Sequence, residues 1–162
     1  MSVLLLIKHA LPEIRQGVPA SQWHLSSEGR KHARLLAPQL AGYRLQRIYS
    51  SQEPKAAETA EILASELKLP FRTAPNLHEH LRPFDPNFDQ QIFEAAVADF
   101  FARPDDLVFG SETADQAHER FRTAVESVVD ANPAQNLAIV AHGTVISLFV
   151  WHACGIEPLP LW

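Results

Sequence analysis

Two kinds of hydrophobic pattern alternate along this chain. Residues 3–7, 45–49 and 137–141 form short runs, and the first and last of these are continuously apolar, as in strands buried on both faces of a parallel sheet. Longer stretches between the runs carry apolar residues at the spacing of an amphipathic helix. Strands that alternate with helices are joined by parallel crossovers. The pattern therefore predicts an α/β fold: a three-layer α/β/α sandwich with a mostly parallel central sheet.

Capping residues, prolines and glycines indicate where the helices begin and end. Ser26 or Ser27 can cap the first helix, which we expect to end at Gly42. Pro54 suits the first turn of the second helix, where a missing N–H costs little. Residues 11–24 and 77–86 are expected to be loops, and residues 70–75 a short extended segment. The expected inward positions are Ala33, Leu36, Ala37 and Leu40 in the first helix, Ala57, Ala60, Ala64 and Leu67 in the second, Phe93, Ala96, Val97 and Phe100 in the third, and Ala114, Ala117, Phe121, Ala124 and Val128 in the fourth. A last, apolar helix is expected over residues 145–153.

Length and composition exclude several classes of protein. The chain has 162 residues, which predicts one domain over residues 1–162, and 46% of them are hydrophobic, enough for a packed core. The net charge of −5 argues against a nucleic-acid partner, which would favour a basic surface. The apolar runs are too short for a bilayer span or a signal-peptide core. We expect a soluble, cytoplasmic protein without a membrane partner.

The chain contains one cysteine, Cys154, at the end of the last apolar stretch. A lone cysteine forms no internal disulfide. We expect Cys154 to be a small buried apolar residue rather than a reactive thiol.

Polar residues follow three of the predicted strands. His9, the pair Ser50-Ser51 and His142 each stand where a strand ends. Ligands of open α/β sheets bind outside the carboxyl ends of the strands. These residues are therefore expected to meet in one crevice, which Lys8 can also reach because strand alternation weakens at a strand end.

Other candidates lie in the loops and first helical turns near these strand ends. Gly143 permits close approach of a ligand to the backbone before a helix start. Lys55 stands in a first helical turn, where the helix dipole disfavours a cation unless an anion lies nearby. Glu79 is either a general acid–base residue or a solvated loop carboxylate. Its neighbours His78 and His80 leave open a metal-dependent hydrolase, with His9 and His142 as further ligands, although His-x-His spacing is not specific.

Six segments in this order resemble the motifs of the histidine phosphatase superfamily, the phosphoglycerate mutase-like proteins. Together they run through nearly the whole chain. The segments are Lys8-His9-Ala10 after the first strand, Leu25 to Gly29, Ser50 to Ala60, Leu77-His78-Glu79, Gly110-Ser111-Glu112, and Ile139 to Gly143.

The resemblance implies a phosphoglycerate mutase-like fold and a metal-independent phosphatase without an organic cofactor. His9 would accept the phosphoryl group, Glu79 would protonate the leaving oxygen, and His142 would bind phosphoryl oxygens as the third catalytic residue. The resemblance also assigns phosphate binding to Lys8 and Lys55, and we add Ser51. The implied partner is a small phosphorylated metabolite or a phosphoprotein.

This chain departs from the motifs at three positions. Lys8 and Lys55 stand where the family has arginines, and Ala10 replaces a glycine. Lysine keeps the charge but loses the planar fork that binds two phosphate oxygens at once. The loss of one donor to a transition-state oxyanion costs about 3 kcal/mol. The alternative is therefore a weakened or inactive relative that binds a phosphorylated ligand or a protein partner. The pair Glu112 and Arg120 is either a structural ion pair or a substrate contact.

Overall fold

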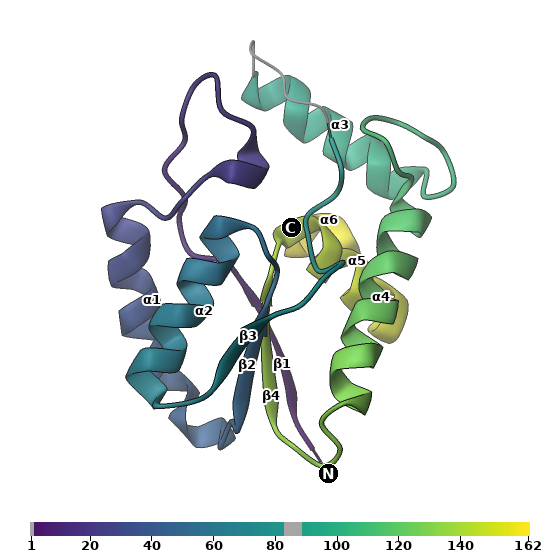
Figure 1. Ribbon diagram of the computed structural model, residues 1–162. Helices are drawn as coiled ribbons and strands as arrows, with labels where there is room; N and C mark the ends of the chain where they lie inside the picture. Colours follow the sequence, from purple (N-terminus) through teal and green to yellow (C-terminus); the bar gives the residue numbers. More distant parts are fainter. Residues whose placement is uncertain (1, 83–88) are drawn as a thin grey trace.

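The centre of the molecule is a fully parallel sheet of four strands. In the computed structural model, residues 2–82 and 89–162 are described. The strands are β1 (Leu4–Lys8), β2 (Arg47–Ser50), β3 (Phe71–Thr73) and β4 (Leu137–Ala141), and their order in the sheet is β1-β4-β2-β3 (Figure 1). The prediction of a parallel sheet between two helical layers is confirmed.

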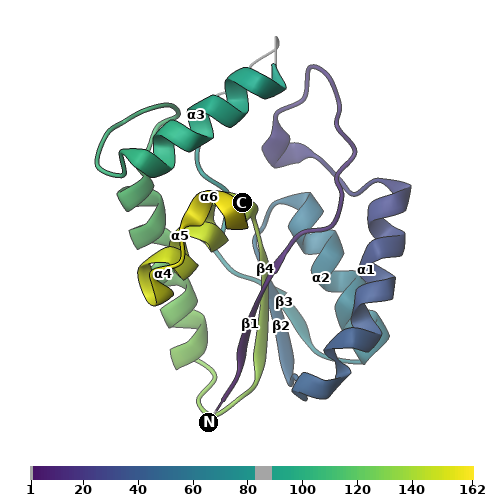
Figure 2. The same cartoon turned by 180° about the vertical axis from the view of Figure 1, so that it is seen from behind.

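Helices cover both faces of this sheet. Helices α1 (Ser27–Leu40) and α2 (Pro54–Leu67) pack on one face, and α4 (Ala114–Asp130) and α5 (Gly143–Cys154) pack on the other (Figures 1 and 2). Helix α3 (Gln90–Ala102) and the short α6 (Pro158–Leu161) lie beyond the second layer. Helix α3 shares a third apolar cluster with α4 and α5, and Trp162, directly after α6, packs against this cluster.

Strand β4 contributes side chains to two separate apolar cores, one on each face of the sheet. All five of its residues are buried, and successive side chains point to opposite faces. Ala138 and Val140 join the core under α1 and α2, whereas Leu137, Ile139 and Ala141 join the core under α4 and α5. Continuous apolar sequence is what a strand buried on both faces requires.

The helix starts follow the sequence, but one helix end does not. The Ser26 side chain accepts a hydrogen bond from the Gly29 amide (2.9 Å) and caps α1, and Thr113 forms a capping box with Gln116 at α4. The predicted stop at Gly42 is wrong. Helix α1 ends at Leu40 and continues into a 3-10 turn, η2 (Ala41–Tyr43), and Arg44 takes the left-handed conformation (φ 51°) that was expected of the glycine.

Two burial predictions also need correction. Cys154 is exposed, because it ends α5 on the outer side of the fold and is followed by the exposed Gly155. In α2, which begins at Pro54, the buried face contains Ala56 and Ala60. Ala57 lies to the side of this face and is only half-buried.

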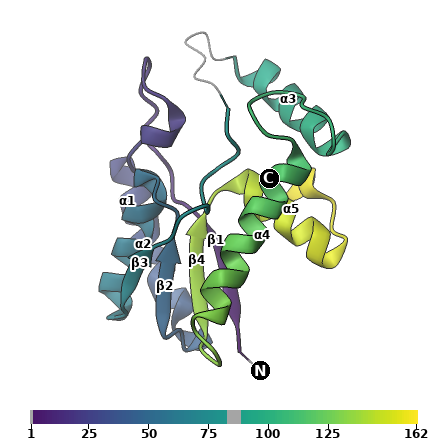
Figure 3. The same ribbon diagram turned by 45° about the vertical axis from the view of Figure 1, so that its right-hand side comes forward.

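A long connection, residues 9–26, rises above the carboxyl ends of the strands (Figure 3). It contains the 3-10 turn η1 (Ala20–Gln22) and is held at its base by a bridge between Pro12 and Leu25. Gly29 permits this arrangement, because a Cβ there would lie 2.1 Å from the Leu11 carbonyl oxygen. The connection forms one wall of the site described next.

Candidate active site

His9 leaves the end of β1 with its ring in a defined orientation. Its amide donates to the Ala141 carbonyl (2.9 Å), so the residue still follows the sheet. Its Nδ1 lies 2.8 Å from the Ala10 carbonyl oxygen, which can only accept, so Nδ1 carries the proton and Nε2 has a free lone pair. Burial lowers the pKa of His9 to about 4, and the nearby Lys55 and Lys8 oppose protonation further. At neutral pH the ring is therefore an uncharged nucleophile.

His142 lies beside His9, in the turn between β4 and α5. The two ring centroids are 5.2 Å apart with an edge-to-face geometry. His142 is fully buried, yet neither ring nitrogen has a hydrogen-bond partner within residues 2–82 and 89–162. Burial holds its pKa well below the usual value. A buried polar group left without a partner carries a free-energy penalty, which a bound anion or ester oxygen would relieve.

Glu79 lies in the irregular segment that crosses the site between β3 and α3. One carboxylate oxygen accepts from the His80 amide (2.8 Å), and the other accepts from the Thr144 amide (3.3 Å) in the first turn of α5. Burial by itself would raise the pKa of Glu79. His142, Arg82 and these two amides outweigh burial and hold the pKa at about 2. Glu79 is thus a carboxylate in the free protein.

The two motif lysines differ in their surroundings. Lys55 is buried, and its ammonium donates to the Glu53 carboxylate (2.5 Å) and to the Ala20 carbonyl (2.7 Å). Lys8 is exposed at the mouth of the site, and its ammonium donates to the Trp162 carbonyl (3.2 Å). The anion that compensates Lys55 in the first turn of α2 is therefore a carboxylate of this chain.

Gly143 makes the position of Lys8 possible. A Cβ at this residue would lie 3.2 Å from both Cε and Nζ of Lys8. The close neighbour of Gly143 in this structure is thus a side chain of the protein, and the approach of a ligand to its backbone stays a prediction.

Ser51 is not brought into the cavity with the other predicted phosphate ligands. It is fully buried, and its hydroxyl accepts from the Glu53 amide (3.2 Å) at the start of α2. Ser51 therefore stabilises the turn that leads into α2, whose N-cap residue is Glu53.

A cavity of about 160 Å³ brings His9, Glu79 and the two lysines together, whereas the fully buried His142 is not one of its lining residues. Sequence reasoning missed several residues of the site. Arg82, Trp23 and Trp162 line the cavity, and Glu53 lies behind it, because their positions depend on how the connecting segments cross the sheet edge. The lining residues are Lys8, His9, Pro12, Ala20, Trp23, Lys55, Glu79, Arg82, Gly143 and Trp162.

The ion pair between Glu112 and Arg120 holds the segment that carries Glu79. The Arg120 guanidinium donates to the Glu112 carboxylate (2.7 Å) and to the backbone carbonyls of Asn76 (2.9 Å) and His78 (3.0 Å). Glu112 in turn accepts from the Leu81 amide (2.9 Å). Of the two interpretations left open by the sequence, these contacts support the structural one.

The four histidines considered as metal ligands do not form one cluster. His80 is buried against Phe100 and Phe109, at centroid distances of 4.3 and 4.7 Å, and its Nε2 faces the Glu112 carbonyl. In the part of the chain that the structure describes, no group of three or more His, Cys, Asp or Glu residues is arranged to hold a metal ion.

From the sequence alone, residues 81–93 are either a loop that covers the pocket or ordinary surface. Helix α3 begins at Gln90 within this stretch, and Arg82 lines the cavity. Residues 83–88 lie outside the described residues.

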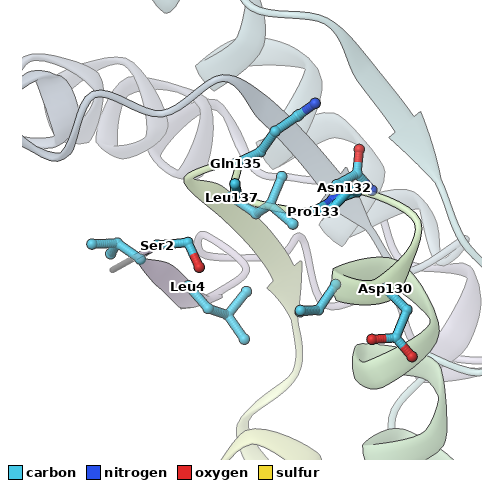
Figure 4. Close-up of a pocket in the computed structure, with 10 residues that line it drawn as sticks. Ser2, Leu4, Asp130, Asn132, Pro133, Gln135 and Leu137 are labelled. Atoms are coloured by element: carbon cyan, nitrogen blue, oxygen red, sulfur yellow. The ribbon is translucent and has the colours of Figure 1, made fainter.

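A second cavity, of about 240 Å³, lies at the opposite end of the sheet (Figure 4). It is lined by Ser2, Leu4, Asp130, Asn132, Pro133, Gln135 and Leu137, among others. Its lining includes one carboxylate and no histidine, lysine or arginine. Because ligands of open α/β sheets bind at the carboxyl ends of the strands, we assign the functional site to the cavity at His9.

None of the helices formed by the described residues is long and apolar enough to cross a membrane.

The fold and the site define an α/β protein with a paired-histidine pocket at the carboxyl edge of a parallel sheet. The chain belongs to the histidine phosphatase superfamily (branch 1), whose sequence profile matches residues 4–162.

Individual relatives agree with this assignment. The chain is 32% identical over 130 residues to phosphoglycerate mutase-like protein 4 of Arabidopsis thaliana, an alignment that covers 75% of this chain and 56% of that protein. The chain thus spans little more than half the length of that relative. Among solved structures, YhfR of Bacillus stearothermophilus superposes with a TM-score of 0.80 at 25% identity, over 100% of this chain and 84% of that one. A mycobacterial glucosyl-3-phosphoglycerate phosphatase with inorganic phosphate has the same fold, with a TM-score of 0.73 at 24% identity over 98% of this chain and 81% of that one.

Proposed function

We propose that this protein is a metal-independent phosphatase that hydrolyses phosphoric monoesters or phosphoproteins through a phosphohistidine at His9. The observation that carries the proposal is the state of His9. Its Nδ1 proton is held on the Ala10 carbonyl, and its low pKa of about 4 keeps Nε2 unprotonated at neutral pH. The family membership and the phosphatases among the structural relatives support the same activity.

The reaction has two steps. In the first, Nε2 of His9 bonds to phosphorus, the bond between phosphorus and the ester oxygen breaks, and protonated Glu79 gives its proton to that oxygen. In the second, the Glu79 carboxylate takes a proton from water, the water oxygen bonds to phosphorus, and the phosphorus–nitrogen bond breaks. Inorganic phosphate leaves, and His9 and Glu79 return to their starting states. Covalent capture divides one difficult displacement into two easier ones.

Glu79 must gain a proton before the first step, although its pKa in the free protein is about 2. A phosphate dianion placed beside the carboxylate raises the pKa of Glu79, because two negative charges in one site repel. Alternatively, the ester binds as a monoanion, and its own proton passes to Glu79. The low pKa of the free site is therefore compatible with a general acid in the complex.

His142 is proposed to bind a phosphoryl oxygen. It is buried against His9, and its ring nitrogens have no hydrogen-bond partner among the described residues, although the Glu53 carboxylate lies 3.7 Å from Nε2. A phosphoryl group bound at His9 would supply such a partner. Phosphoryl transfer depends mainly on such positioning and on stabilising charge on the equatorial oxygens.

The proposed substrate is a small phosphorylated metabolite or a phosphoprotein. The cavity has two indole walls, Trp23 and Trp162, whose N–H groups are bonded to the Val18 carbonyl (2.9 Å) and to the Thr144 hydroxyl (3.1 Å). With their N–H groups occupied, the rings offer apolar surface to the organic part of an ester.

A second candidate function is a weakly active or inactive relative that binds a phosphorylated ligand. The contact between Lys55 and Glu53 favours it, because a cation that is already paired with a carboxylate is less available to phosphate.

Hydrolysis of a chromogenic aryl phosphate between pH 5 and 8 separates the two candidates. The phosphatase predicts turnover that is unchanged by a chelator and lost in His9→Ala. Rapid acid-free trapping should then detect one phosphohistidine per chain, absent from the variant. Phosphohistidine that persists in His9→Ala contradicts the proposed nucleophile, and phosphate binding without turnover establishes the second candidate.

A further inference from the structure

We propose that Arg82 is the guanidinium that binds the phosphoryl group in this pocket, taking over the role that the family's motif arginines would have at Lys8 and Lys55. The inference rests on the proposed phosphate chemistry of the site and names a binding residue for it. It makes Arg82 a substrate-binding residue outside the motif positions.

Arg82 lies where a phosphoryl group would be captured. It lines the same cavity as His9, Lys8, Lys55 and Glu79. Its charge is one of those that lower the pKa of Glu79, which places the guanidinium within electrostatic reach of the general acid. A dianion at His9 would therefore meet Arg82 on the same side as the carboxylate that has to become protonated.

The Arg82 guanidinium has an unused donor. Its Nη1 is shielded from solvent and has no hydrogen-bond partner in the two described parts of the chain. No carboxylate among these residues forms an ion pair with it. A buried guanidinium N–H without an acceptor is unfavourable in the free protein, and an anion in the cavity would satisfy it.

The Arg82 guanidinium is oriented by its contact with Phe93 of α3. The Arg82 guanidinium carbon stands 4.5 Å from the centroid of the Phe93 ring, in the first turns of α3. A cation over an aromatic face is held without consuming its N–H donors, which lie in the guanidinium plane. The Nη1 donor thus remains available for a phosphate oxygen.

The two lysines do not fill this role. The Lys55 ammonium is engaged by Glu53 at 2.5 Å and by the Ala20 carbonyl at 2.7 Å. The Lys8 ammonium is exposed and bonded to the Trp162 carbonyl at 3.2 Å. Neither offers the two parallel donors of a guanidinium, whereas Arg82 does.

The experiment measures inorganic phosphate binding by calorimetry in parallel with aryl phosphate turnover. The variants are Arg82→Gln and Arg82→Lys in the full chain. The matched control is Arg72→Gln, which removes the same charge from an exposed residue of β3. Circular dichroism and thermal unfolding verify that each variant is folded.

We expect Arg82→Gln to weaken phosphate binding about 10-fold or more, as for loss of a charge-assisted hydrogen bond, and to lower kcat/KM about 100-fold. Arg82→Lys should recover only part of the binding, since it restores charge without the fork, and Arg72→Gln should bind phosphate like the wild type.

Two results overturn the inference and are distinguishable. Wild-type phosphate affinity in a folded Arg82→Gln, or full recovery by Arg82→Lys, contradicts the guanidinium role and leaves the proposed phosphatase intact. A wild-type chain that neither binds phosphate nor turns over aryl phosphate contradicts the proposed function, and the inference fails with it.

Discussion

At the scale of single residues, the site depends on keeping two imidazoles neutral. His9 and His142 stand 5.2 Å apart, and burial lowers the pKa of each. Two cations nearby, Lys55 and Lys8, strengthen this effect at His9. This arrangement keeps Nε2 of His9, the proposed nucleophile, unprotonated over the physiological range.

The pH profile of kcat/KM tests the state of His9. The nucleophile is lost when Nε2 gains a proton, so activity should fall on the acid side through a pH near 4, the pKa of His9, rather than near the 6.5 of an exposed histidine. The measurement is steady-state hydrolysis of an aryl phosphate at constant ionic strength.

An acid limb centred near pH 6.5 would contradict a buried, neutral His9. Lys8→Met provides an internal check, because the removal of a neighbouring cation should shift the limb to slightly higher pH.

Much of the site could be predicted from the sequence, because its residues follow the strand ends. Strand ends fix the neighbourhood of Lys8, His9 and His142 whatever the loops do. Glu53 and Arg82 lacked such a signal. Glu53 meets the site through Lys55, which also binds the Ala20 carbonyl, and Arg82 packs on Phe93 of α3. These contacts depend on the tertiary arrangement of the connecting segments, which local residue spacing does not predict.

At the scale of elements, the segment between β3 and α3 is positioned by another element. Residues 74–82 form no helix or strand, and Arg120 from α4 binds the carbonyls of Asn76 and His78. Glu112 completes the arrangement through the Leu81 amide. Arg120 of α4 therefore holds the backbone of the segment that carries Glu79, whereas the carboxylate itself is held by the His80 and Thr144 amides.

Arg120→Met should destabilise the protein by about 3 kcal/mol, since it leaves the mostly buried carboxylate of Glu112 without its partner. It should also lower kcat more than it raises KM, because a displaced Glu79 affects proton transfer more than binding. Chemical unfolding and steady-state kinetics measure the two effects.

The control is Arg122→Met, two residues along the same helix. Arg122 pairs with Glu119 and Glu126 on the exposed face, where ion pairs contribute little. Equal losses of stability in the two variants would contradict a special role for Arg120.

Element boundaries show what local sequence leaves open. The start of α1 at Ser27 follows from a side-chain cap that is visible in the sequence. Its end does not follow, because Gly42 has the freedom to stop a helix but the chain turns at Arg44 instead, where the approach to β2 is determined by tertiary contacts with residue 136.

At the scale of the whole molecule, the buried ionisable groups make folding sensitive to acid. The unfolded chain protonates His9 near pH 6.5, whereas the folded chain resists until about 4, so between these values the unfolded state holds more protons. Stability should therefore rise with pH over this window. Below pH 4.5, the protonation of Glu79, whose folded pKa is about 2, removes further stability.

Urea unfolding at several pH values between 4.5 and 7.5 measures this dependence. The slope of the free energy of unfolding against pH reports how many more protons the unfolded state binds. His9→Gln should reduce this number by up to about one. An unchanged slope in His9→Gln would contradict the burial argument.

The contact between Glu79 and the first turn of α5 has a consequence for the whole reaction cycle. The Thr144 amide lies at the positive end of the helix and holds the carboxylate in the free protein. In the proposed reaction that carboxylate becomes neutral only when a phosphoryl group arrives beside it. After the first step Glu79 has given up its proton, so the helix end then faces the carboxylate and the phosphohistidine together. The Thr144 amide is therefore in place to stabilise the same carboxylate at two points of the cycle, before the substrate binds and after the first step.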